Sequence, residues 1–182
     1  MTGPTIPRPT IATLLGEYDR ALDHTDRLWE GLTVEEVHWR PDEEPSAIGW
    51  HLGHQAAVGH FMVRNLTSAE PSPDPELDAL MDSATPERRR GDLPELDRLR
   101  RYRTTVAERL RVNVTRIADG QVGAPAQLDV VARTLLVALV NHEYQHSQWI
   151  GEVRSDALGH APIPHPTSEL LRTIDGYCVL AG

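Results

Sequence analysis

The sequence predicts an all-α protein, a four-helix bundle with a long connection between its second and third helices and a C-terminal tail. Three observations predict this fold. Four long segments space their apolar residues at the period of an α-helix. Prolines gather in the stretches between these segments, where helices cannot continue. No segment shows a convincing strand-like alternation of apolar and polar residues.

The first two helices are expected over residues 11–32 and 47–66. Apolar side chains recur in the first at roughly every 3.6 residues. Thr33 and Glu36 resemble a capping box that opens a short helical turn. The second helix is apolar on more than one side, which predicts burial between neighbours. The connection over residues 67–91 is long and polar, and such a connection in a compact protein is usually functional or disordered.

The third helix is expected over residues 95–118, with arginines and carboxylates on a solvated outer face. The fourth follows Ala124 and Pro125, because proline is tolerated in a first turn, and runs to about Arg154. A short helix is expected near residues 167–174. We expect a single domain over residues 1–182, with its core at about 10–155 and its tail at 156–182.

Composition excludes several functions. The net charge of −9 and the pI of about 5.4 argue against nucleic acid as a partner. No apolar segment is long enough to span a bilayer, and no secretory signal is visible at the N-terminus, so cytoplasmic location is the default. All 18 basic residues are arginine, which excludes a lysine nucleophile. The single cysteine, Cys178, is expected to be a small buried residue.

The most informative motif is H-E-x-x-H at residues 142–146, inside the fourth helix. His142 and His146 are four residues apart, so both imidazoles lie on one helical face and can reach a single metal ion. The motif is usually that of a zinc peptidase. The longer metzincin pattern fails, because Trp149 and Glu152 stand where it requires glycine and histidine. A peptidase also needs a sheet edge, and we expect no strands.

A catalytic zinc site usually has three protein ligands and an open position. The second helix offers the third ligand, because in a bundle it can face the fourth. His54 is flanked by the small residues Gly53 and Ala57, which would leave room for a metal. His51 lies one turn away and could serve instead.

Two stretches carry a resemblance to a known family. They are SAIGWHLGH at residues 46–54, which follows a Trp-Arg-Pro sequence, and NHEYQHSQ at residues 141–148. Together they resemble the DinB-like family of metal-binding four-helix bundles, over roughly residues 10–155. They are most similar to the N-terminal domain of ergothioneine-type sulfoxide synthases, which have a second domain that this chain has no room for. The resemblance implies His54, His142 and His146 as the metal ligands.

The resemblance also implies a function. Stand-alone members of the family resemble mycothiol- or bacillithiol-dependent S-transferases and maleylpyruvate isomerase. We therefore expect an enzyme that uses a divalent metal to activate a low-molecular-weight thiol, such as mycothiol, for S-transfer or isomerisation of an electrophilic substrate. Zinc is the default metal, and iron or nickel would also suit imidazole ligands. The alternatives are a non-catalytic metal-binding or thiol-sensing bundle and a metal-dependent hydrolase.

Other roles stay open at this stage. Glu143 is a candidate acid or base catalyst, or else a partner of a ligand or an arginine. Gln145 and Gln148 line the cavity or face solvent. The remaining expectations are a thiol carboxylate bound by Arg64, Arg103 or Arg154, and surface positions for His24, His38, His160 and His165. The thiol, the substrate and the choice between monomer and homodimer are not fixed by the sequence.

Overall fold

The computed structural model describes residues 9–41, 45–67 and 70–180. Most of the N-terminal stretch in which a secretory signal was sought lies outside these residues. The four long helices of the prediction are present with bounds close to those expected: α1 (Ile11–Trp29), α3 (Ile48–Thr67), α5 (Leu96–Ala118) and α6 (Pro125–Glu152). The all-α bundle with a C-terminal tail is therefore confirmed.

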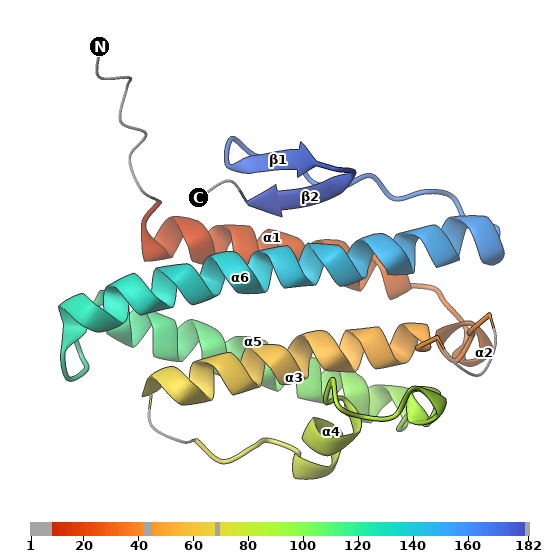
Figure 1. Cartoon of the computed structure of the whole chain (residues 1–182), viewed down its shortest axis with the longest axis horizontal. Coiled ribbons are helices and arrows are strands. Elements are labelled where there is room, and N and C mark those ends of the chain that lie inside the picture. The colour runs from red at the N-terminus through yellow and green to blue at the C-terminus, as the bar shows by residue number, and fades with distance from the viewer. Residues whose placement is uncertain (1–8, 42–44, 68–69, 181–182) are drawn as a thin grey trace.

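The long helices pack as two pairs, α1 with α6 and α3 with α5, and α3 also packs on α6 (Figure 1). The first pair runs in one direction and the second in the other. Because α3 and α5 are parallel neighbours, the chain must return along the bundle between them. The core consists of two buried apolar clusters, one toward each end of the bundle, and all four long helices contribute to both. The face that α3 turns toward α6 is where the histidines meet.

The connections contain short helices. The capping box predicted at Thr33 and Glu36 is present and opens α2 (Val34–Val37). The long connection between α3 and α5 forms α4 (Pro75–Leu80) and a 3₁₀ turn, η1 (Glu87–Arg89). Asp74 caps α4 through its side chain and also accepts two hydrogen bonds from Arg98, each at 2.7 Å. These contacts tie the start of α4 to α5, and α4 itself packs on α3.

The tail corrects one prediction. A π-helical turn, η2 (Val153–Ala157), ends α6, and an antiparallel hairpin of β1 (Leu171–Ile174) and β2 (Tyr177–Leu180) then lies on α6 (Figure 1). The short helix expected near residues 167–174 is therefore wrong, as is the expectation of no strands. Asp175 and Gly176 form the turn with φ of 51° and 87°. Positive φ at both central residues is the geometry that Asp-Gly favours in a hairpin.

The tail segment that precedes the hairpin contacts a buried polar patch between α1 and α6. His24 is 2 % exposed, and its ring lies 4.7 Å from that of His165 and 6.1 Å from that of Tyr144, measured between centroids. The surface position expected for His24 is therefore wrong. Cys178 is buried as expected. The Leu180 N–H donates to Asn141 Oδ1 at 2.7 Å and ties the hairpin to α6.

We expect the buried His24 to make the folded protein less stable in mild acid. Burial, with smaller contributions from His165 and Arg27, lowers the pKa of His24 from 6.5 to about 4. Between pH 6.5 and pH 4, the unfolded chain binds a proton at His24 that the folded chain does not bind. The free energy of unfolding therefore keeps the whole contribution of His24 above pH 6.5 and decreases as the pH falls toward 4. At pH 5 we expect this one group to cost up to about 2 kcal/mol.

Urea unfolding of metal-free protein at pH 7 and pH 5 measures the effect. The variant His24→Phe, which has no proton to bind, should lose less stability than the wild type over this interval. Parallel losses in the two proteins would show that His24 is not responsible.

Within the described ranges, no helix combines the length and the apolarity needed to cross a membrane.

Candidate metal centre

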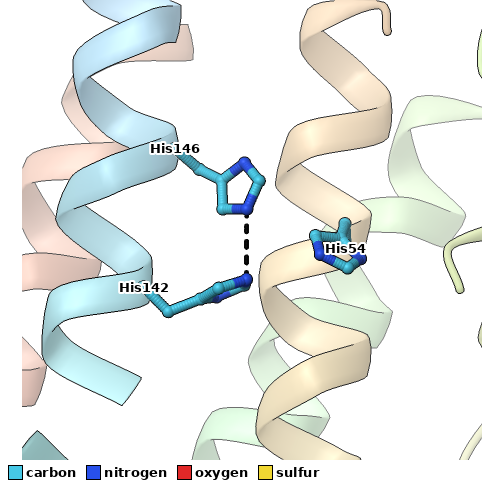
Figure 2. A group of neighbouring side chains, drawn as sticks. All are labelled: His54, His142 and His146. Atoms are coloured by element: carbon cyan, nitrogen blue, oxygen red, sulfur yellow. Dashed lines mark hydrogen bonds between the residues drawn. The ribbon is translucent and has the colours of Figure 1, made fainter. Parts of the chain in front are cut away.

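Three histidine rings meet between α3 and α6 (Figure 2). His142 and His146 project from successive turns of α6 toward His54 on α3. Their Nε2 atoms are 3.1 Å apart. One ring nitrogen from each of the three residues lies within 4.8 Å of the other two. The structure thus brings together the three residues that the sequence singled out, and no other such group is found among the described residues.

The arrangement fits a shared metal ion. Two imidazole nitrogens bound at 2.0–2.1 Å to one tetrahedral ion lie roughly 3.3–3.4 Å apart. The 3.1 Å between His142 Nε2 and His146 Nε2 is within a few tenths of an ångström of that separation. Small side-chain shifts would therefore place both nitrogens at ligand distance, with His54 closing the site from the facing helix.

The ring of His54 is held in a fixed orientation. Its Nδ1 lies 2.7 Å from the carbonyl oxygen of Met81. Because a carbonyl can only accept, Nδ1 carries the proton and Nε2 keeps its lone pair for a metal. The ring also stacks on Trp50, with 4.6 Å between centroids and 10° between planes. The two contacts fix both the tautomer and the tilt of His54.

Gly53 makes the contact with Met81 possible. A Cβ on Gly53 would come within 2.5 Å of the Met81 sulfur, which only glycine avoids. The sequence-based view that Gly53 leaves room for the metal is therefore corrected, since the room is taken by Met81. The Trp50 indole N–H donates to the Leu80 carbonyl at 3.1 Å. The connection between α3 and α5 thus orients His54 and the tryptophan on which it stacks.

His146 has a partner of its own. Its Nδ1 lies 2.6 Å from His51 Nδ1, so one of the two rings donates to the other. If His146 offers Nε2 to a metal, its Nδ1 holds the proton and His51 accepts it. The His51 ring packs on Trp149 with 4.2 Å between centroids. His51 is therefore placed to orient His146, and it lies at the mouth of the site.

Burial keeps these imidazoles neutral. Burial, with a smaller contribution from the neighbouring histidines, lowers the pKa of His142 to about 4 and that of His146 to about 2. Burial also lowers the pKa of His54, although the Met81 carbonyl opposes this. A neutral imidazole is the form that binds a metal, so at pH 7 no proton has to leave these rings first.

The Glu143 side chain points away from the three histidines and into the bundle. It is 3 % exposed and its carboxylate accepts a hydrogen bond from the Arg103 guanidinium of α5 at 3.1 Å. Burial raises the pKa of Glu143, and Arg103 opposes this. The offset of one residue from His142 turns the carboxylate into the bundle and away from the helical face of the two histidines. This geometry gives no support to Glu143 as an acid or base catalyst at the metal.

A groove of about 250 Å³ opens beside the histidines. Gln145 and Gln148 line it, as expected if they face the cavity. Its full lining is His51, Gln145, His146, Gln148, Trp149, Glu152 and Tyr177. A larger groove of about 730 Å³ lies between α1 and α5, contains none of the site histidines, and includes the already paired Arg103. Of the two grooves, the smaller one borders the histidines, through His51 and His146.

Comparison with known proteins places the chain in a family. The family model described as the DinB superfamily matches residues 17–150, which include both histidine-bearing helices. The chain belongs to the DinB superfamily. A search of curated proteins found no match. Membership in the DinB superfamily agrees with a metal-binding helical fold and does not select a metal, a thiol or a reaction.

His51 gives a prediction specific to this DinB protein. Replacing it with alanine removes the acceptor for His146 Nδ1–H. Loss of such an outer partner typically costs 10–100-fold in metal affinity, so we expect His51→Ala to weaken zinc binding by roughly that factor. Competition with a chromophoric chelator measures the affinity. His38→Ala, at the residue that follows α2, is the control, and equal affinities for all three proteins would show that His51 does not support His146.

Proposed function

We propose that this chain is a metal-dependent enzyme that activates a low-molecular-weight thiol for S-transfer or isomerisation. The observation that carries the proposal is the trio His54, His142 and His146 with an open groove beside it. Three protein ligands leave an ion with a free position, which is the mark of a catalytic rather than a structural site. The proposed metal is zinc, since the donor set of three imidazoles suits it.

When bound, a divalent ion on three neutral imidazoles lowers the pKa of a coordinating thiol and so supplies the nucleophilic thiolate. The chain's own residues would orient the metal ligands and bind the substrates. His54 and His146 would be held in place by Met81 and His51, respectively. The groove would admit the thiol from the side of His51. The second, electrophilic substrate would bind in the same groove.

A metal-dependent hydrolase is favoured less. A hydrolase built on H-E-x-x-H uses the glutamate as general base beside the metal-bound water. Here Glu143 is paired with Arg103 in the bundle interior. The groove lining includes one carboxylate, that of Glu152, and its side chain is exposed. A thiol needs no such base, because coordination alone shifts its pKa.

Cobalt substitution tests the proposal. We expect protein loaded with Co²⁺ to gain a sulfur-to-cobalt charge-transfer band in the near ultraviolet when 2-mercaptoethanol or cysteine is added. Ethanolamine, which has no sulfur, should leave the spectrum unchanged. A spectrum unaffected by several thiols would overturn the thiol function, and failure of the protein to bind cobalt would overturn the metal site as well.

A further inference from the structure

We propose that Arg90, in the connection between α3 and α5, positions the imidazole of His54 for the metal ion. This inference rests on the metal site of the proposed function and adds a residue that sets its geometry. Arg90 acts on both contacts that orient the His54 ring, the Met81 carbonyl and the Trp50 indole.

The Arg90 side chain binds the segment that follows Met81. Its Nε donates to the Thr85 carbonyl at 3.1 Å, and its Nη2 donates to the Ser83 carbonyl at 2.8 Å. These two acceptors are two to four residues beyond Met81, whose own carbonyl accepts the hydrogen bond from His54 Nδ1. Arg90 therefore fixes the part of the chain that supplies the acceptor for His54.

Arg90 also ties this segment to the beginning of α3. Its Nη1 donates to the buried Ser46 hydroxyl at 3.4 Å, and its own carbonyl accepts from the Ala47 N–H at 3.3 Å. Ala47 immediately precedes α3, the helix that carries His54. The position of the connection on this helix, and with it the Met81 carbonyl beside His54, therefore depends on Arg90.

The same arginine packs on the ring against which His54 is aligned. Its guanidinium lies over the Trp50 ring, with 4.4 Å between Cζ and the centroid, which is a cation–π contact. Trp50 in turn stacks on His54 with nearly parallel planes. Trp50 is 2 % exposed, so its tilt is set by the groups packed around it, Arg90 among them. Loss of the guanidinium would therefore loosen the surface that aligns the imidazole.

Arginine is suited to make all of these contacts at once. A planar guanidinium carries five N–H donors in a fixed fork, and it can stack on an aromatic ring while it donates in its own plane. Lysine would keep the charge beside the indole but loses the fork. The Nε, Nη1 and Nη2 atoms of Arg90 each donate within the protein, so this side chain orients other groups rather than binding a ligand.

A double-mutant cycle on zinc affinity tests the inference. Zinc dissociation constants are measured by competition with chromophoric chelators for the wild type, Arg90→Ala, His54→Ala and the double variant, and circular dichroism confirms that each is folded. If Arg90 acts through His54, its replacement matters only while His54 is present. Arg89→Ala is the matched control, because Arg89 is the neighbouring arginine and pairs with Asp92 at the surface.

We expect Arg90→Ala to weaken zinc binding roughly ten-fold, the lower end of the 10–100-fold that is typical when a group that orients a ligand is lost. It should have no effect in the His54→Ala background, and Arg89→Ala should match the wild type. Arg90→Lys, which keeps a cation beside the indole, should lose less, and it replaces Arg90→Ala in the cycle if the alanine variant does not fold.

Two results would overturn the inference and leave the proposed function standing. One is an unchanged zinc affinity on replacement of Arg90. The other is the same loss with and without His54, which would mean that Arg90 supports the bundle in general and not this ligand. A wild-type protein that binds no zinc would overturn the proposed function and this inference with it.

Discussion

Replacing His146 with alanine is expected to abolish the stabilisation of the protein by metal. His146 contacts His142 through Nε2 and His51 through Nδ1. Its replacement removes one of the three proposed metal ligands and the residue that links His142 to His51. A ligand that binds only the folded chain, present at 100 times its dissociation constant, stabilises it by about 2.7 kcal/mol. For a chain of this size, that corresponds to a rise in Tm of about 5–10 °C.

The quantity to compare is the rise in Tm on adding zinc, because any packing defect lowers the metal-free and metal-loaded proteins alike. Differential scanning calorimetry with and without zinc should show the full rise for the wild type and for the control His38→Ala. It should show almost none for His146→Ala. An equal rise in all three proteins would mean that zinc binds elsewhere.

The second large effect concerns the buried ion pair of Glu143 and Arg103. Both side chains are nearly inaccessible, at 3 % and 6 % exposed. Removing Glu143 leaves the buried Arg103 with Asp26, an exposed carboxylate at 3.4 Å, as its remaining ion-pair partner among the described residues. Loss of one partner of a buried ion pair typically costs 3–5 kcal/mol, and we expect Glu143→Ala to lose about 3 kcal/mol, the lower end of that range. The variant should still bind one metal ion, because its three imidazoles are intact. Urea unfolding and metal analysis measure the two properties.

A double variant separates charge from packing. Arg103→Met combined with Glu143→Leu removes both charges and fills the space, so it should recover most of the stability lost by Glu143→Ala. Glu108→Ala, at an exposed position on α5, should change stability little. A Glu143→Ala protein of wild-type stability that has lost thiol transfer would contradict the structural role and restore the catalytic one.

The bundle could be predicted from the sequence because each long helix carries its own periodic signal. The period of the apolar residues over 11–32 and 95–118 depends only on local spacing. The capping box at Thr33 and Glu36 is local as well. The hairpin also had a local signal, the Asp175–Gly176 pair, and it was missed because its four-residue strands are too short for a convincing alternation.

Local spacing in the sequence could predict only two of the three histidines of the candidate site. The four-residue spacing of His142 and His146 places both on one helical face. The choice of His54 came from the family resemblance, since no spacing rule links it to the others. Contacts between distant segments have no sequence signal, and these include the Met81 carbonyl on His54 and the pairing of His51 with His146. The burial of Glu143 against Arg103 is likewise a property of the packed bundle.

X-ray absorption at the zinc edge tests the central claim most directly. For wild-type protein loaded with one equivalent of zinc, we predict three imidazole nitrogens at about 2.0–2.1 Å and a fourth light atom, and His54→Ala should lose one imidazole. Added 2-mercaptoethanol should replace the fourth atom with a sulfur at about 2.3 Å. A zinc environment that contains fewer than three imidazoles, or that His54→Ala leaves unchanged, would contradict the account.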